Sequence, residues 1–189
     1  MPTDNIIKAT KKGTGEIEGV NYEEFTYEGY APNGVAVLLE TVTDNKKRTV
    51  SEIRSLMTKH GGNLGETGSV AWNFERKGVF TINTDGKTED ILMETILEAD
   101  AEDLEYNDDT ARIICAMENF SIVNKYLEEQ KFTITEAKLE YIAKNIVNIS
   151  DIASANKVLK FIDIFEDHDD VQNVFYNFTI DDSIADSIE

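Results

Sequence analysis

The chain has 189 residues, of which 37 are acidic and 18 are lysine or arginine, and its net charge is −19. Its hydrophobic content of 41% is typical of a protein with a buried core, and no apolar run approaches the length of a membrane-spanning helix. The first residues lack the apolar stretch of a secretory signal, and the single cysteine, Cys115, has no partner for an internal disulfide. These features predict a cytoplasmic protein with no membrane partner. The sequence shows no coiled-coil pattern, so a monomer is expected.

The charge is distributed unevenly along the chain. Residues 1–86 carry 10 basic and 12 acidic side chains, whereas residues 87–189 carry 8 and 25. Nucleic acids are bound by cations that displace counterions from phosphates, so any such contact is expected in the first half. The acidic half is expected to keep the protein soluble; alternatively, it repels nucleic acid and so orients the molecule.

The first elements are a short helix and a β-hairpin. Pro2 and Asp4 suit the start of a helix within residues 1–15, which reads as the remnant of a preceding helical domain. Residues 20–30 and 35–42 then form two strands, because β-branched and aromatic residues flank a turn that contains glycine and proline.

The most informative stretch runs from residue 43 to residue 78. Thr49 and Glu52 form a capping-box pattern, which predicts a helix that begins after a basic loop, Lys46–Lys47–Arg48. Gly61 and Gly62 end this helix. Strands are predicted at 69–75 and 79–83, with a turn at 76–78 between them. Trp72 and Phe74 share one face of the first strand, where core packing is favoured over base stacking.

The remainder alternates between helices and strands. The elements expected are a helix over 88–99, a hairpin of 103–106 with 111–117, a helix capped by Asn119, a strand over 137–143, a helix capped by Ser150 or Asp151, and a strand over 171–180. A final helix and strand cannot bury their apolar faces alone, so we expect them to return to the first sheet.

The predicted fold class is α+β, with two α/β-sandwich (ferredoxin-like) domains, the second inserted into the first. The predicted boundaries are a helical remnant at 1–15, a discontinuous domain of 16–87 with 149–180, an inserted domain of 88–148, and a frayed acidic tail at 181–189.

Motifs for catalysis or cofactor binding are not found. His60 and His168 lie far apart and belong to no metal-binding pair, and a lone cysteine forms no zinc or redox motif. The glycine-rich segment GGNLGETGS lacks the lysine and hydroxyl residue that end a phosphate-binding P-loop. We therefore predict no enzyme activity, no cofactor and no metal.

The remaining candidate for function is a binding surface. Lys46, Lys47 and Arg48 precede a helix N-terminus, which favours anions. The glycines of 61–68 either present N–H groups to phosphate or serve turn geometry alone.

Several segments resemble one known family. MPTDNIIKATKKGTG, EFTYEGYAPNGVAVLLE with the stretch 43–78, EADAEDLEY and EDHDDVQNVFYNF are similar, in this order, to segments of the YebC/PmpR family. That family also includes the mitochondrial translational activator of cytochrome oxidase subunit I. The resemblance implies an N-terminal three-helix bundle followed by two α+β domains, with the last helix and strand returning to the second domain. Of the lysine-rich opening bundle, only the final helix is matched here.

The resemblance implies a regulator of gene expression, most simply a DNA-binding transcriptional regulator. One alternative is a translation factor that engages the ribosome or ribosomal RNA. Another is a protein-binding module whose acidic half docks a basic protein partner. Loss of the basic bundle would weaken binding to DNA or ribosomal RNA. The candidate nucleic-acid-binding residues are Lys46, Lys47, Arg48, Lys59, Gly61, Gly62 and Asn63.

Overall fold

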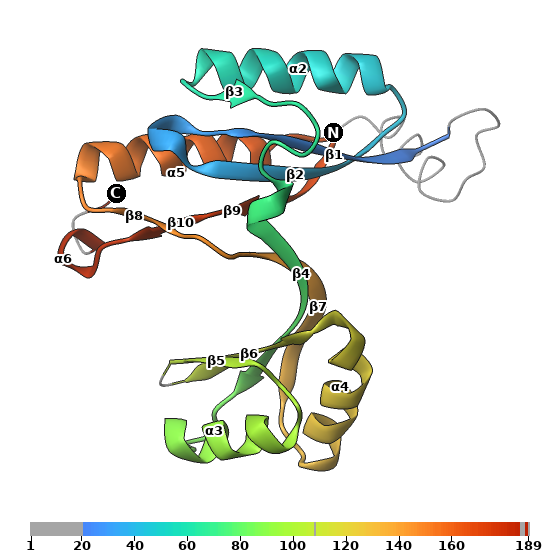
Figure 1. Ribbon diagram of the computed structural model, residues 1–189, viewed down its shortest axis with the longest axis vertical. Coiled ribbons are helices and arrows are strands. Elements are labelled where there is room, and N and C mark those ends of the chain that lie inside the picture. The colour runs from blue at the N-terminus through green and yellow to red at the C-terminus, as the bar shows by residue number, and fades with distance from the viewer. Residues whose placement is uncertain (1–20, 108, 186–187, 189) are drawn as a thin grey trace, which may run out of the picture. The chain divides into compact units, whose positions relative to one another are not determined.

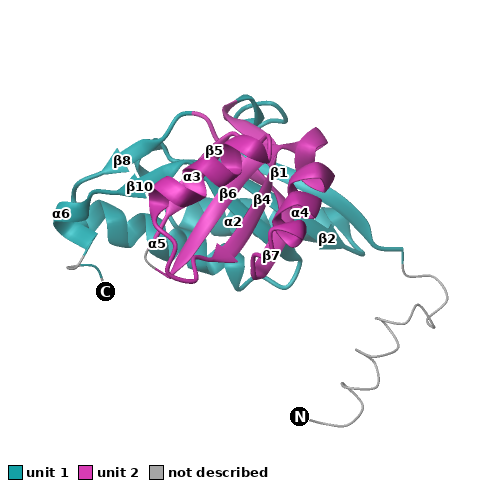
Figure 2. Cartoon of the chain, turned by 90° about the horizontal axis from the view of Figure 1, so that it is seen from below, with its two compact units in different colours: residues 1–72, 145–189 teal, residues 73–144 magenta. Residues whose placement is uncertain are grey.

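The computed structural model describes residues 21–107, 109–185 and 188, and the helix predicted within residues 1–15 lies outside them (Figure 1). The described chain divides into two compact units (Figure 2). Unit 1 contains the residues up to Trp72 and those from Asn145 onward, and unit 2 is Asn73–Lys144. The sequence placed the two boundaries after residues 87 and 148. The first differs because the strand after Trp72 pairs within the sheet of unit 2. The predicted α+β class is confirmed.

Unit 1 contains a four-stranded antiparallel sheet in the order β3-β1-β2-β9. The predicted hairpin is present, and the strand after the last long helix does pair with β2. That segment is interrupted, however, and its second half pairs with a parallel strand in a separate two-stranded sheet. The elements are β1 (Glu23–Tyr30), η1 (Pro32–Gly34), β2 (Ala36–Thr43), β3 (Asn63–Leu64), η2 (Ala71–Asn73), β8 (Val147–Ile149), β9 (Val171–Tyr176) and β10 (Phe178–Ile180).

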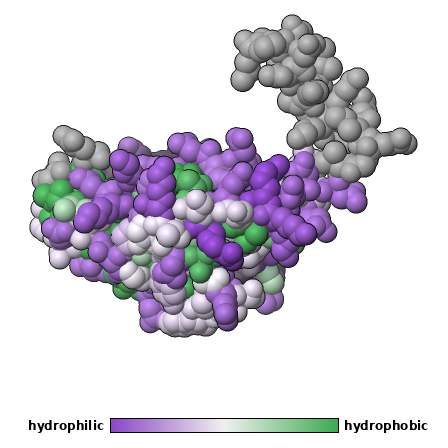
Figure 3. Space-filling view, turned by 90° about the horizontal axis from the view of Figure 1, so that it is seen from above, coloured by the Kyte–Doolittle hydropathy of each residue, from purple (hydrophilic) through white to green (hydrophobic). Residues whose placement is uncertain are grey.

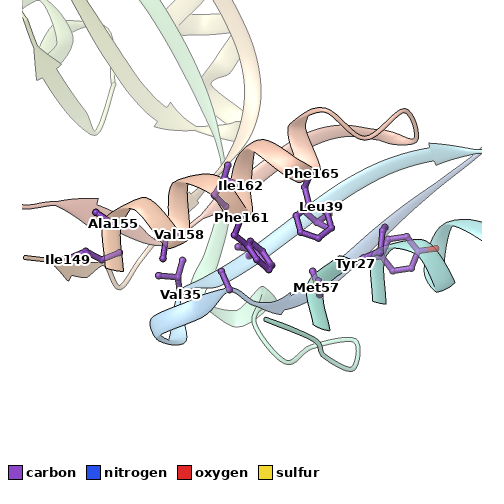
Figure 4. Close-up of a cluster of buried hydrophobic side chains, with 13 residues drawn as sticks. Tyr27, Val35, Leu39, Met57, Ile149, Ala155, Val158, Phe161, Ile162 and Phe165 are labelled. Atoms are coloured by element: carbon purple, nitrogen blue, oxygen red, sulfur yellow. The ribbon is translucent and has the colours of Figure 1, made fainter. Parts of the chain in front are cut away.

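Two helices pack on one face of this sheet. They are α2 (Lys46–Lys59) and α5 (Ile152–Glu166). Alternation along β1 and β2 directs Tyr27, Val37 and Leu39 to the same side, and all three belong to the core that the helices complete. Figure 4 shows side chains of α5 and α2 directed toward these strands. The buried apolar positions of the two helices recur every three or four residues: Ile53, Met57, Ala155, Val158, Phe161, Ile162 and Phe165.

A buried carboxylate ties the segment that follows β3 to the sheet. Glu28 is 6% exposed, and its oxygens accept backbone N–H bonds from Gly68, Val70 and Ala71 at 2.7–2.8 Å. Burial by itself raises the pKa of Glu28, but these three hydrogen bonds outweigh burial and lower its pKa. The carboxylate therefore stays charged and fixes the irregular segment between β3 and η2 together with the first residue of η2.

Unit 2 has a four-stranded antiparallel sheet in the order β5-β6-β4-β7, covered on one face by α3 and α4. Its core contains Phe80, Ile113 and Cys115 from the strands, with Ile96 and Leu127 from the helices. The elements are β4 (Phe74–Asn83), α3 (Glu89–Glu98), β5 (Asp103–Tyr106), β6 (Thr110–Ala116), η3 (Met117–Asn119), α4 (Phe120–Glu129) and β7 (Ile134–Ala143).

The predicted turn at residues 76–78 is wrong. This segment lies in the middle of β4, which pairs with β6 on one side and β7 on the other. Gly78 is required by packing, because a Cβ there would lie 2.6 Å from the ring of Phe120 and 2.8 Å from the sulfur of Cys115. The core position expected for Trp72 is also wrong, since Trp72 is 64% exposed whereas Phe74 is buried.

The chain after residue 180 also differs from the expected frayed tail. Asp182–Ala185 forms the short helix α6, and the side chains of Ile184 and Ile188 pack against the core of unit 1. Among the described residues, no helix is long and apolar enough to cross a membrane.

Replacing Glu28 with alanine should lower the free energy of unfolding by about 2–3 kcal/mol, because three backbone N–H groups would lose their acceptor in a buried site. Chemical denaturation measures this loss. The matched control is Glu24→Ala, an exposed carboxylate on the same strand, which should change stability by less than about 0.5 kcal/mol. Equal effects of the two substitutions would contradict the assignment.

Candidate nucleic-acid interface

Helix α2 carries most of the predicted site, and it begins earlier than the sequence indicated. Asn45 is the N-cap, and its side-chain oxygen accepts the N–H of Arg48 at 3.1 Å. Thr49, predicted as the cap, lies inside the helix and is fully buried. The capping-box interpretation is therefore wrong, and Lys46, Lys47 and Arg48 occupy the first helical turn instead of a loop.

Thr49 is buried because it binds a carboxylate from a distant part of the chain. Its hydroxyl donates to Asp170 Oδ2 at 2.6 Å and lies 2.8 Å from the hydroxyl oxygen of Thr43. The guanidinium of Arg48 donates to both oxygens of Asp170, at 2.8 and 3.0 Å. Asp170 immediately precedes β9, so this cluster fastens the start of α2 to the returning strand. We call Thr43, Arg48, Thr49 and Asp170 the Asp170 clasp.

Electrostatics keep the clasp charged at neutral pH. Burial of Asp170 acts to raise its pKa, but the hydrogen bonds from Thr49 and Arg48 and the charge of Arg48 outweigh burial, so its pKa is lowered. Arg48 also lies 3.3 Å from a carboxylate oxygen of Asp44 and 3.9 Å from one of Glu52. Three carboxylates thus surround Arg48, which suits it to a structural role more than to binding phosphate.

An open, acidic cavity of about 680 Å³ lies at the same end of α2. Beside Arg48, the imidazole of His168 accepts the N–H of Asp170 at 3.1 Å and lies 3.6 Å from Glu52. The lining contains five carboxylates and would repel a phosphate backbone. It is formed by Tyr22, Val42, Asp44, Arg48, Glu52, Asp167, His168, Asp169, Asp170 and Gln172.

The other two members of the basic tripeptide have different surroundings. Lys46 lies over the ring of Phe25, with its ammonium 4.1 Å from the ring centroid, in a cation–π contact. Lys47 is exposed on the outer side of the helix. The structure therefore separates three adjacent cations into three environments.

The remaining predicted residues lie at the far end of α2, about 20 Å away for a helix of this length. Lys59 is exposed in the last turn. The N–H groups of Gly61 and Gly62 donate to helix carbonyls at 3.4 and 2.8 Å, and Asn63 pairs with β1. Gly62 also lies against the ring of Phe161, where a Cβ would come within 2.6 Å. These glycines serve the helix terminus and close packing, and the structure does not bring them together with Lys46–Arg48.

The structure shows an outer face of α2 that the sequence analysis missed. Lys47, Ser51, Arg54 and Thr58 are spaced at i, i+4, i+7 and i+11, so they share the side opposite the buried residues of α2. All four are exposed, as is Ser55 beside them. Figure 3 looks from above, the side on which α2 lies in Figure 1, and hydrophilic surface predominates over hydrophobic surface in that view. We call Lys47, Ser51, Arg54, Ser55 and Thr58 the α2 face; its helical spacing was the signal that could have revealed it.

Metal binding finds no support in the described part of the chain, where no three histidine, cysteine or acidic side chains are placed to share an ion. Cys115 is buried, and burial raises the pKa of its thiol to about 11. This thiol is therefore uncharged and unreactive at neutral pH.

Comparison with known proteins identifies the family. A family model described as the second and third domain of TACO1/YebC matches residues 22–178. The chain belongs to the TACO1/YebC family. The family predicted from the sequence is therefore confirmed.

Relatives at high identity carry a regulatory name. A probable transcriptional regulatory protein of Dictyoglomus turgidum is 52% identical over 189 residues, which are 100% of this chain and 76% of that protein. One from Thermotoga maritima is 50% identical over 190 residues, covering 100% of this chain and 74% of that protein. The crystal structure of a conserved hypothetical protein from Aquifex aeolicus matches with a TM-score of 0.81 at 42% identity. That match covers 98% of this chain and 76% of the Aquifex chain.

For this TACO1/YebC chain, Asp170→Asn should lower the free energy of unfolding at pH 7 by about 2 kcal/mol, because Thr49 and Arg48 would lose a charged acceptor. The pKa of Asp170 is lowered in the folded state, so its contribution to stability is complete above the ordinary aspartate pKa of 3.8 that applies to the unfolded chain. The contribution is lost as pH falls through the lowered pKa. Denaturation from pH 7 to pH 2 should show the two proteins converging in stability only in acid.

The control is Asp169→Asn, which removes the same charge from the neighbouring exposed residue. It should leave stability at pH 7 within about 0.5 kcal/mol of the unmodified protein. A destabilisation by Asp170→Asn that is the same in acid as at pH 7 would exclude the ionised clasp.

Proposed function

We propose that the chain is a non-enzymatic regulator of gene expression that binds nucleic acid through the α2 face. The names of the relatives support the regulatory role. The main observation that supports a binding surface on α2 is the positive charge of this helix within an otherwise acidic protein. Five of the chain's 18 lysine and arginine residues lie on this helix, against one acidic residue, Glu52, and two of the five, Lys47 and Arg54, belong to the α2 face.

The arrangement of side chains on the α2 face suits a phosphate backbone. Lys47 and Arg54 supply positive charge, and Ser51 and Ser55 supply hydroxyl donors on the same side, whereas the Thr58 hydroxyl donates to the Arg54 carbonyl at 2.9 Å. Phosphate oxygens are bound by both kinds of group. The opposite side of α2 is held by the core at Ile53 and Met57, so the helix is presented as a rigid element.

Double-stranded DNA is the ligand we favour. The major groove of B-DNA is about 12 Å wide and admits an α-helix, whereas the major groove of A-form RNA is too narrow for side chains to read. An exposed helix with one cationic face fits the first geometry. Arg54 lies near the middle of α2, where a bidentate contact to guanine would be available in that groove.

The hydroxyl groups of the α2 face favour one alternative, a translation factor that binds ribosomal RNA. RNA duplexes are recognised through phosphates and 2′-hydroxyls across a shallow minor groove, and serine and threonine side chains suit such contacts. Competition between duplex DNA and structured RNA of equal length, at one salt concentration, distinguishes the two ligands. Preferential displacement by RNA would favour the translation factor.

The double substitution Lys47→Glu with Arg54→Glu should abolish most nucleic-acid binding, because two attractive charges become repulsive. Measured across a salt series with duplex DNA, the dependence of log K on log salt should become shallower by about 2, at roughly 0.9 per phosphate contact. Fluorescence anisotropy provides the measurement.

The matched control is Lys157→Glu with Lys160→Glu, which makes the same charge change at exposed positions of α5 in the same unit. This control should retain its salt dependence. If both pairs weaken binding equally, the effect is one of net charge and the α2 face is not the binding surface.

A further inference from the structure

Strand β7 forms a long, uncovered edge of the sheet in unit 2. Among the described strands it pairs with β4 alone, and all ten of its residues are exposed or half-buried. The opposite edge is β5, which has four residues. A long edge strand leaves backbone N–H and C=O groups along one side that another strand can bind.

The two faces of β7 have different chemistry. On one face, Lys138 lies between Glu136 and Glu140, with its ammonium 3.1 Å from an oxygen of each, and Glu140 also pairs with Arg112 of β6. On the other face lie Ala137 and Leu139, and Leu139 is 39% exposed. Leu139 pairs with Gly78 of β4.

This pattern is complementary to itself in an antiparallel arrangement. A two-fold axis at Leu139 places Leu139 of one copy opposite Leu139 of the other, and Lys138 of each copy opposite Glu140 of its partner. Directly opposed residues in such a pair have Cβ atoms about 4.5–5.5 Å apart, so the leucines touch and the opposite charges meet. In-register parallel pairing would instead oppose Lys138 to Lys138, which is unfavourable.

We propose that a second copy of this chain binds at β7, joining two four-stranded sheets into one continuous sheet across a two-fold axis. Each copy uses the same surface, as is usual for a symmetric dimer. Charged residues on an edge strand discourage pairing with arbitrary strands. Here the alternation of glutamate and lysine blocks most registers and admits the one that brings Lys138 to Glu140.

The interface is a single strand pair, so it buries less area than the roughly 1,200–2,000 Å² of stable complexes. The net charge of −19 on each copy opposes association as well. The dimer is therefore weak, and it is best measured at about 0.15 M salt, where charges beyond roughly 8 Å are screened. The sequence predicts a monomer, and the proposed dimer differs from that prediction.

Disulfide capture tests the proposed register. In Leu139→Cys, the two new thiols face each other across the axis and should form a covalent dimer under mild oxidation. The control is Glu136→Cys, an exposed position on the same strand whose two copies are about 20 Å apart in this register. The native Cys115 is buried and does not compete. Leu139→Cys should cross-link at least tenfold faster than Glu136→Cys.

Adding Lys138→Glu to Leu139→Cys should return cross-linking to the control rate, because the introduced glutamate of each copy would then lie opposite Glu140 of its partner. Thermal unfolding of each variant checks that unit 2 remains folded. Sedimentation equilibrium of the unmodified chain should show a mass rising from 21.3 kDa toward twice that value with concentration. A constant mass of 21.3 kDa, or equal cross-linking of Leu139→Cys and Glu136→Cys, would overturn the proposal.

Discussion

The Asp170 carboxylate connects parts of unit 1 that are far apart in the sequence. It accepts hydrogen bonds from Arg48 and Thr49, more than 120 positions away, at the point where β9 enters the sheet beside β2. Because Asp170 is largely buried and remains charged, its two donors must hold their positions. The start of α2 is thereby fixed, and with it the direction in which the outer side of the helix points.

The α2 face follows from this constraint. The clasp and the core residues Ile53 and Met57 hold one side of α2 against the sheet and α5, which leaves Lys47, Ser51, Arg54 and Thr58 toward solvent. Arg48 is part of the clasp and is surrounded by carboxylates, so it contributes to the position of the helix more than to its outer charge. The positive charge of the α2 face therefore comes from Lys47 and Arg54, neither of which lines the acidic cavity.

Local patterns in the sequence predicted much of the fold. The hairpin of β1 and β2, the helices α3 and α5, and the Asp151 cap of α5 were each visible in short segments. The errors arose where a distant contact decided the outcome. Threonine is a common helix-capping residue, but the hydroxyl of Thr49 donates a hydrogen bond to Asp170 instead. Gly78 has the chemistry of a turn, but the neighbouring Phe120 and Cys115 explain its small size.

The candidate site was predicted only in part, because contacts between distant parts of the chain also decide which of its side chains are free. The sequence located its positive charge on the segment around α2, but it grouped Lys46–Arg48 with Lys59–Asn63, which lie at opposite ends of the helix. The ion pair of Arg48 with Asp170 depends on the fold and is not visible in a basic tripeptide. Ser51, Ser55 and Thr58 lie between these two groups, and helical spacing alone would have placed them on the exposed side of α2.

Nuclear magnetic resonance during a titration with duplex DNA tests most directly whether the α2 face binds nucleic acid. The backbone amide signals of Lys47, Ser51, Arg54, Ser55 and Thr58 should shift together as DNA is added, and 0.5 M salt should reverse the shifts. The signals of residues 61–63 should change less, since their surroundings are set by the helix terminus and by pairing with β1. Shifts confined to residues 61–63 or to unit 2, with α2 unchanged, would contradict the account.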